Sequence, residues 1–163
     1  MKLIHVLLFA FLAGMNLPVS AQGEKSTTVL ITPAPPEDWS KLSDSNASKL
    51  RRLQQSGTYK WLLLVRVGNL AKIQKEGILT FAIPSTGEKA TYKAKKVVAY
   101  SESDFTWYGF SADGEALFIC KEGRLSGNFR VNGRSFELSS IEGEDELSVL
   151  TESPIHQDLE CGR

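Results

Sequence analysis

The side chains best suited to chemistry in this sequence gather near its C-terminus. His156, Asp158, Glu160 and Cys161 fall within six positions, and Gly162 follows them. Imidazole, carboxylate and thiolate groups are the ligands that zinc takes from proteins. The surrounding residues have no apolar period, so a metal site made from this segment alone would have to order a loose tail at a high entropic cost. The cluster leaves three interpretations open: a private metal site, a disulfide through the cysteine, and a tail without a function.

The disulfide interpretation concerns Cys120 and Cys161, the two cysteines of the chain. An even number of cysteines in an oxidising compartment favours a disulfide. Cys120, however, falls in an apolar run that predicts a strand within a sheet, whereas the segment around Cys161 predicts an extended tail. A disulfide requires Cα atoms within about 7 Å of each other. We therefore predict that these two cysteines do not pair.

The rest of the chain offers few groups for catalysis. His5 lies in the N-terminal leader described below, so His156 is the one histidine that remains, and nothing near it in sequence would hold it rigid. No H-E-x-x-H or C-x-x-C spacing occurs. The acidic run at 142–146 is typical of a solvated turn. We expect no enzymatic activity, no cofactor and no catalytic residue in this chain.

Two further patterns have a structural explanation. Lys93, Lys95 and Lys96 could bind a polyanion, but the chain has 19 basic and 19 acidic residues, so a bulged strand with a solvated side explains these lysines better. Trp107 and Tyr108 could stack on a sugar. Neighbouring residues of a strand point to opposite faces, however, so we expect one ring in the core and the other outside it. The balanced charge also argues against nucleic acid as a partner.

The first residues predict export. Lys2 precedes an apolar stretch at 3–13 that is too short to span a bilayer, and Val19-Ser20-Ala21 places small residues at the positions that signal peptidase reads. We expect residues 1–21 to be a signal peptide and the mature protein to be periplasmic or extracellular. No later run is apolar enough to predict a transmembrane segment.

The mature chain, about 140 residues long, predicts one all-β domain. From Tyr59 onward, apolar residues alternate and turns recur about every ten residues, which indicates an antiparallel meander forming a small sandwich or barrel. An edge strand at 29–32 and two short helices, at 45–56 with Asp44 as N-cap and at 69–76, are expected in the N-terminal half. The predicted strands are 59–67, 78–83, 90–100 (with a bulge near Lys95), 105–110, 116–120, 125–131, 134–138 and 146–150.

This pattern sets the expected boundaries and core. We predict a signal peptide at 1–21, an N-terminal segment with a short helix at 22–57, a β domain at 58–150 and an extended tail at 151–163. Asn132-Gly133 predicts a two-residue type I′ hairpin, because both residue types accept positive φ. Period-two spacing predicts that the core side chains include Leu79, Phe81, Ile83, Trp107, Leu117, Ile119, Phe129, Phe136 and Leu138.

Three segments of the chain follow one another in a recurring order. They are 78–87 (ILTFAIPSTG), 105–109 (FTWYG) and 116–138 (ALFICKEGRLSGNFRVNGRSFEL). Together they resemble the N-terminal prodomain of secreted bacterial zinc metalloproteases of the reprolysin-like (metzincin) kind, over roughly residues 65–149. Ser85-Thr86 departs from that family, which favours Pro-Asp there. The chain ends shortly after Cys161-Gly162, where the family continues into a catalytic domain with H-E-x-x-H.

The resemblance implies a function in trans. Cys161-Gly162 is similar to the pair of a cysteine switch, in which a prodomain thiolate fills the open position on the catalytic zinc; the flanking residues do not match the best-known switch motifs. We therefore expect an exported prodomain-like protein, monomeric when free, that binds a secreted zinc metalloprotease as inhibitor or folding helper. His156, Asp158, Cys161 and Gly162 would contact the partner, with Cys161 on its zinc. The alternatives are a non-inhibitory envelope β domain that binds a ligand or partner, and a truncated remnant of a protease gene.

Overall fold

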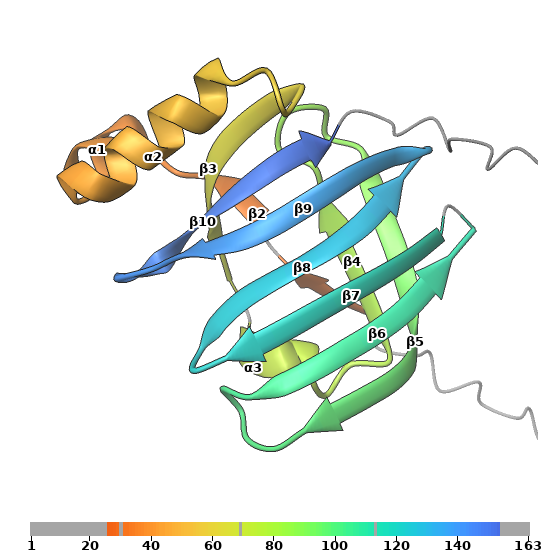
Figure 1. Cartoon of the computed structure of the whole chain (residues 1–163). Coiled ribbons are helices and arrows are strands. Elements are labelled where there is room, and N and C mark those ends of the chain that lie inside the picture. The colour runs from red at the N-terminus through yellow and green to blue at the C-terminus, as the bar shows by residue number, and fades with distance from the viewer. Residues whose placement is uncertain (1–25, 30, 69, 113, 154–163) are drawn as a thin grey trace, which may run out of the picture.

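The computed structural model describes residues 26–29, 31–68, 70–112 and 114–153. These residues form the expected all-β domain, in which one sheet of ten strands curls into a nearly closed barrel (Figure 1). The strands are β1 (Ser26–Val29), β2 (Ile31–Pro33), β3 (Trp61–Val67), β4 (Ile78–Ala82), β5 (Lys89–Ala99), β6 (Phe105–Ser111), β7 (Gly114–Lys121), β8 (Arg124–Val131), β9 (Arg134–Ile141) and β10 (Glu144–Ser153). The helices are α1 (Pro36–Lys41), α2 (Asp44–Gln55) and α3 (Leu70–Ile73).

The two N-terminal strands form the two edges of the sheet. Strands β4 to β10 form an antiparallel meander, and β10 then pairs with β3. β1 pairs in parallel with β4 while β2, the next segment of the chain, pairs antiparallel with β3. One short stretch thus joins the two ends of the sheet. The strands of the sheet therefore begin at Ser26, ahead of the predicted β domain at 58–150, and β10 continues to Ser153, three residues past the predicted end of that domain.

The β8–β9 hairpin and the bulge in β5 are present as the sequence predicts. Asn132 and Gly133 have φ values of 49° and 74°, as the β8–β9 hairpin requires. The pairing of β5 with β6 shifts between Ala94 and Lys96, which is the expected bulge. The three lysines of this region are exposed on β5. Trp107 is fully buried whereas Tyr108 is partly exposed, so the two rings take opposite faces as predicted.

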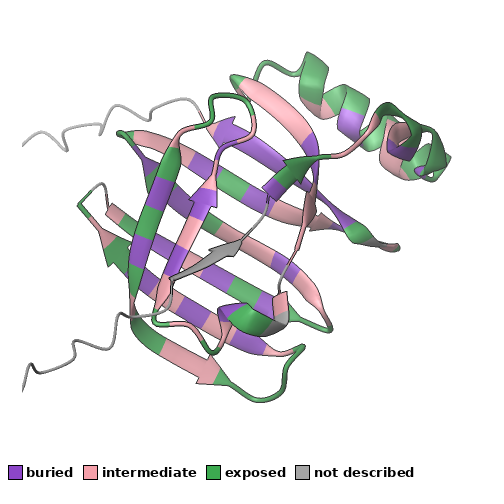
Figure 2. Ribbon diagram, turned by 180° about the vertical axis from the view of Figure 1, so that it is seen from behind, coloured by how far each residue is buried: buried purple, intermediate pink, exposed green. Residues whose placement is uncertain are grey.

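Most of the predicted core is buried, but the prediction for β7 is wrong. Figure 2 shows buried and more exposed residues alternating along the strands. In β7 the interior side chains are those of Ala116, Phe118 and Cys120, whereas Ile119 is 47% exposed and Leu117 is only partly buried. Both faces of β7 are apolar in sequence, so an alternating pattern alone cannot show which face is buried. Shifting the assignment by one residue moves every side chain of the strand to the opposite face.

Aromatic rings fill the interior. The ring of Phe81 stacks on that of Tyr92 and meets those of Phe118 and Phe129 edge-on, with centroids 4.7–5.5 Å apart. Gly109 makes room for Trp107, because a Cβ at this position would lie 2.2 Å from the indole ring. The indole Nε1 donates to the carbonyl oxygen of Glu76 at 3.2 Å, which ties the segment after α3 to the barrel.

Helices α1 and α2 lie outside the barrel, against β3 and β10 (Figure 1). Ser43, and not the predicted Asp44, caps α2, because its hydroxyl accepts a hydrogen bond from the backbone N–H of Asn46 at 3.3 Å. Asp38 of α1, which the sequence did not predict to be helical, receives hydrogen bonds from Arg66 of β3 at 2.8 and 2.9 Å. α3 is a single turn, shorter than predicted, because the backbone N–H groups of Lys75 and Glu76 bond three residues back and form turns after Ile73.

Candidate functional site

The interior of the barrel is filled by side chains. The largest fully buried ones include Trp107, Tyr92 and Phe81. A void among apolar side chains of β2, β3, β4, β7, β8, β9 and α3 has no room for a water molecule. A ligand site must therefore be sought on the outer surface of the described residues.

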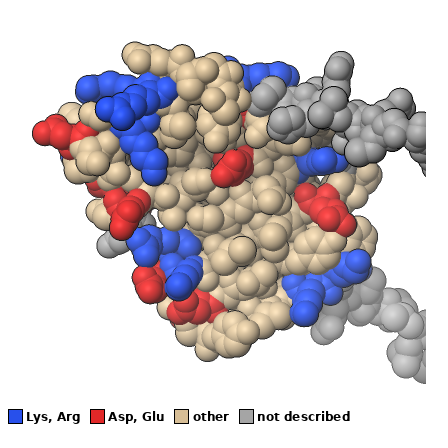
Figure 3. Space-filling view, in the orientation of Figure 1, with Lys and Arg blue, Asp and Glu red and all other residues tan. Residues whose placement is uncertain are grey.

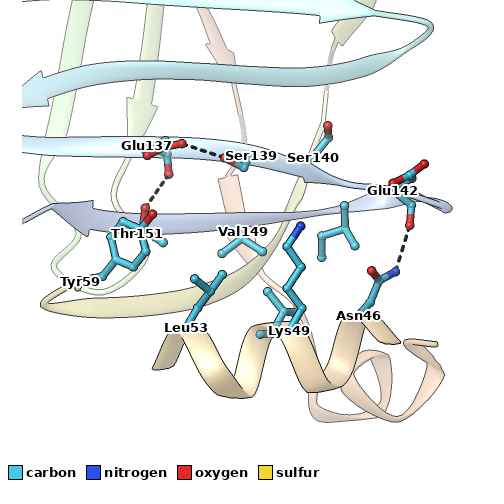
Figure 4. Close-up of a pocket in the computed structure, with 12 residues that line it drawn as sticks. Asn46, Lys49, Leu53, Tyr59, Glu137, Ser139, Ser140, Glu142, Val149 and Thr151 are labelled. Carbon is cyan, nitrogen blue, oxygen red and sulfur yellow. Dashed lines mark hydrogen bonds between the residues drawn. The ribbon is translucent and has the colours of Figure 1, made fainter. Parts of the chain in front are cut away.

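A groove of about 370 Å³ runs along the outside of the barrel, between α2 and the strands β9 and β10. We call it the α2 groove. Its apolar residues come from both walls: Leu50 and Leu53 from the helix, Ile141 from β9 and Val149 from β10. Helix α2 presents this face because leucines three residues apart fall on one side of a helix. Figure 4 shows Leu53 and Val149 facing each other across the groove.

Polar groups surround this apolar floor. Lys49 extends from α2 toward the strands, with Glu137 and Glu142 on either side of it (Figure 4). Among the described residues no carboxylate forms an ion pair with Lys49. Ser139 donates to the Glu137 carboxylate at 3.1 Å, and Thr151 donates to the Glu137 carbonyl oxygen at 3.4 Å. The groove thus offers one cation, two carboxylates and several hydroxyl groups beside an apolar surface.

The helical wall of the groove is fixed to the β9–β10 turn. The side-chain amide of Asn46 donates to the carbonyl oxygen of Glu142 at 2.9 Å. The backbone N–H of Ser43 donates to the carboxylate of Glu144 at 3.2 Å. Because these contacts hold the first turn of α2 against the turn, the groove is formed without a ligand and would bind one at a small ordering cost.

A second polar cluster surrounds Glu152 at the end of β10. Its carboxylate is 3% exposed and accepts hydrogen bonds from Arg134 at 2.6 and 3.1 Å, from Trp61 at 2.7 Å and from Lys60 at 3.2 Å. Arg134 also bonds Glu88, beside the β4–β5 turn, at 2.6 Å. We call these five residues the Glu152 clamp. They connect β3, β9 and β10 with the β4–β5 hairpin.

The clamp shifts the pKa of its carboxylate strongly. Hydrogen bonds from Arg134 are the largest cause, and with those from Lys60 and Trp61 they lower the pKa of Glu152 from 4.5 to about 2, although burial alone would raise it. Glu152 in turn raises the pKa of Arg134. Every member of the clamp is thus satisfied within the protein, which indicates a structural role for it.

The outer face of β6 and β7 is a third notable surface. Phe110 and Ile119 are each 47% exposed there. Figure 3 shows that uncharged side chains cover much of the side of the barrel that Figure 1 turns to the viewer, with most charged groups toward its margins. Cys120, next to Ile119, points into the core; its thiol is free, and burial raises its pKa.

The residues that the sequence singled out for partner contacts, His156, Asp158, Cys161 and Gly162, lie outside the described residues, and so does the predicted signal peptide. Within the described part of the chain, no three His, Cys, Asp or Glu side chains are grouped so that they could hold a metal ion. No helix in that part is long and apolar enough to cross a membrane.

Sequence reasoning missed the α2 groove and the Glu152 clamp. Lys49 and Glu137 are ordinary surface residues in sequence, and Glu142 was assigned to a solvated turn, where it does lie. The two walls of the groove are separated by about 90 residues, so no local pattern relates them. Arg134 directly follows the glycine of the predicted hairpin, but its place in the sequence does not identify Glu152 as its partner.

Comparisons with protein-family models, with curated proteins and with solved structures return no match to this chain. The functional argument therefore rests on the geometry of these surfaces and on the motifs of the sequence.

Proposed function

We propose that this chain is a non-catalytic binding protein that takes its ligand in the α2 groove. The observation that carries the proposal is the contrast between a barrel interior without free volume and a preformed groove of about 370 Å³ outside it. Ligand sites in proteins have about this size and combine apolar walls with a few polar groups. Lys49 supplies such a group, because no described carboxylate neutralises it.

The test uses the uncharged apolar fluorescent probe N-phenyl-1-naphthylamine and two variants. Ser139→Arg places a bulky side chain in the α2 groove, whereas Ile119→Arg places the same side chain on the outer face of β7. We expect the native protein to enhance the emission of the probe, Ser139→Arg to abolish most of the enhancement, and Ile119→Arg to retain it. The opposite pattern would move the binding surface to β7 and contradict the proposal.

A second candidate function is inhibition or assisted folding of a secreted zinc metalloprotease in trans. The order of motifs in 78–138 supports it, and so does the Glu152 clamp, which fixes the end of β10 one residue before the last described position. From Ser153, where β10 ends, the eight residue steps to Cys161 would span up to roughly 28 Å if extended. The exposed Phe110 and Ile119 would supply an apolar docking surface for the protease.

The mechanism of this candidate is displacement of the nucleophile. The thiolate of Cys161 would replace the zinc-bound water that such proteases use for attack. Because zinc takes the thiolate, inhibition should weaken in acid. The test is an inhibition assay against a secreted H-E-x-x-H protease, with docking measured in parallel. We expect Cys161→Ser to lose inhibition more than docking and Ile119→Asp to lose both; equal inhibition by Cys161→Ser would refute the switch.

A further inference from the structure

We infer that the ligand of the α2 groove is a short zwitterionic peptide with apolar side chains. The inference rests on the proposed function and adds the chemical class of the ligand. Its basis is the combination of an apolar floor with charges of both signs that the protein leaves without partners of its own.

The apolar floor calls for an apolar side chain. Leu50 is buried and Leu53 half-buried on α2, and Ile141 and Val149 face them from the strands. Burying apolar surface against such a floor contributes roughly 25 cal/mol per Å². A leucine side chain has this chemistry, and the groove's volume of about 370 Å³ has room for it.

The charges around the floor call for both an amine and a carboxylate. Lys49 has no ion-pair partner among the described residues, and neither has the carboxylate of Glu142, whose carbonyl oxygen alone is bonded, to Asn46. A purely anionic ligand would meet Lys49 but also the carboxylates of Glu137 and Glu142. A purely cationic ligand would meet the unpaired ammonium group. A molecule with both charges avoids each repulsion and complements each group.

The polar edge of β9 fits the rest of a peptide. Ser139 and Ser140 line the groove on the strand side, and Asn46 and Tyr59 line it at its ends (Figure 4). Such hydroxyl and amide groups can donate and accept, as a peptide main chain does. The peptide would place its carboxylate at Lys49, its amine at Glu142 and its side chains on the floor.

Four forms of one peptide test this assignment on the full chain. Tri-leucine with free ends, its N-acetylated form, its C-amidated form and the doubly blocked form are titrated and followed by amide NMR. We expect each block to weaken binding about three- to fivefold, the effect of one exposed ion pair. Lys49→Met should weaken the free peptide by the same factor and leave the C-amidated form unchanged. Glu142→Gln should weaken binding of the free peptide by the same factor and leave binding of the N-acetylated form unchanged.

Arg51→Met is the matched control, because Arg51 is an exposed cation of the same helix that does not line the groove. It should change none of the four affinities. Octanoate and octylamine serve as comparators with one charge each. If all four peptides bind equally, or if a comparator binds in the groove and no peptide does, the zwitterionic class is overturned and the proposed function stands. If none of the six compounds shifts a groove amide, the proposed function falls as well.

Discussion

The α2 groove and the Glu152 clamp are both polar clusters on the same two strands, β9 and β10, and they differ in how their charges are satisfied. In the clamp the buried carboxylate of Glu152 receives four hydrogen bonds from three residues. In the groove Lys49 remains exposed and without an ion-pair partner among the described residues. A buried charge must be neutralised by the protein itself, whereas an unneutralised charge beside an apolar floor is available to a ligand. The first cluster therefore stabilises the barrel, and the second is where binding is expected.

The largest expected effect is the loss of the clamp. Arg134→Met removes two of the four hydrogen bonds to Glu152 and leaves its carboxylate buried. We expect the free energy of unfolding to fall by about 3 kcal/mol, as for other broken buried ion pairs. Denaturant unfolding measures it. Arg130→Met, at an exposed position of β8, is the matched control and should cost less than about 0.5 kcal/mol. Equal costs would show that the clamp is not a stabilising element.

The clamp also predicts how stability depends on pH. The pKa of Glu152 is about 2 in the folded protein, whereas the ordinary value of 4.5 applies in the unfolded chain. As the pH falls, the unfolded chain therefore takes up the proton first. The contribution of Glu152, about 3 kcal/mol by linkage, is complete above pH ~5 and is lost toward pH ~2. Thermal melts of the native protein and of Glu152→Gln across this range should converge in acid. Parallel curves would contradict the assignment.

A smaller effect is expected at the helical wall of the groove. Ser43→Ala removes the side-chain cap of α2 and should lower stability by about 1 kcal/mol. The same variant should weaken ligand binding, because loss of the cap loosens the first turn of α2, although the backbone N–H of Ser43 can still donate to Glu144. Ser45→Ala, which changes an exposed serine of α2 that does not line the groove, is the control. Hydrogen exchange of the α2 amides should rise in the first variant and stay unchanged in the second.

The smallest effect on stability is expected from the loss of the Lys49 charge in the α2 groove. Lys49→Met should change the free energy of unfolding by less than about 0.5 kcal/mol, because Lys49 is exposed and makes no ion pair within the described residues. Its effect should be on ligand binding alone. A loss of stability close to that of Arg134→Met would mean that Lys49 has a structural role and would remove the distinction between the two clusters.

The sequence predicted those features that depend on local chemistry. The Asn132-Gly133 hairpin, the bulge of β5 and the meander of short strands follow from turn residues and alternation, and all are present. The inward face of β7 could not be predicted, because Leu117 and Ile119 are as apolar as Phe118. What decides the face is the pairing with neighbouring strands, including the lack of a side chain at Gly127, where a Cβ would lie 2.6 Å from the Phe118 ring.

The barrel and the α2 groove are formed by contacts between residues that are far apart in sequence. The two edges of the sheet are formed by β1 and β2, which the pattern had placed outside the β domain. The α2 groove forms only when the helix at Asp44–Gln55 meets strands near the other end of the domain. Cys161, on which the metalloprotease proposal depends, lies outside the described residues, so that proposal still derives from the motifs. Long-range packing, and not residue type, creates the candidate site.

The most direct test of the central claim is to map where a ligand binds on the full chain. Amide NMR spectra are recorded during titration with N-phenyl-1-naphthylamine and, separately, with tri-leucine. The account predicts that the largest shifts fall on α2, β9 and the middle of β10, around Lys49, Ser139 and Val149. Shifts that centre on the outer face of β6 and β7, around Phe110 and Ile119, with the α2 amides unchanged, would contradict it.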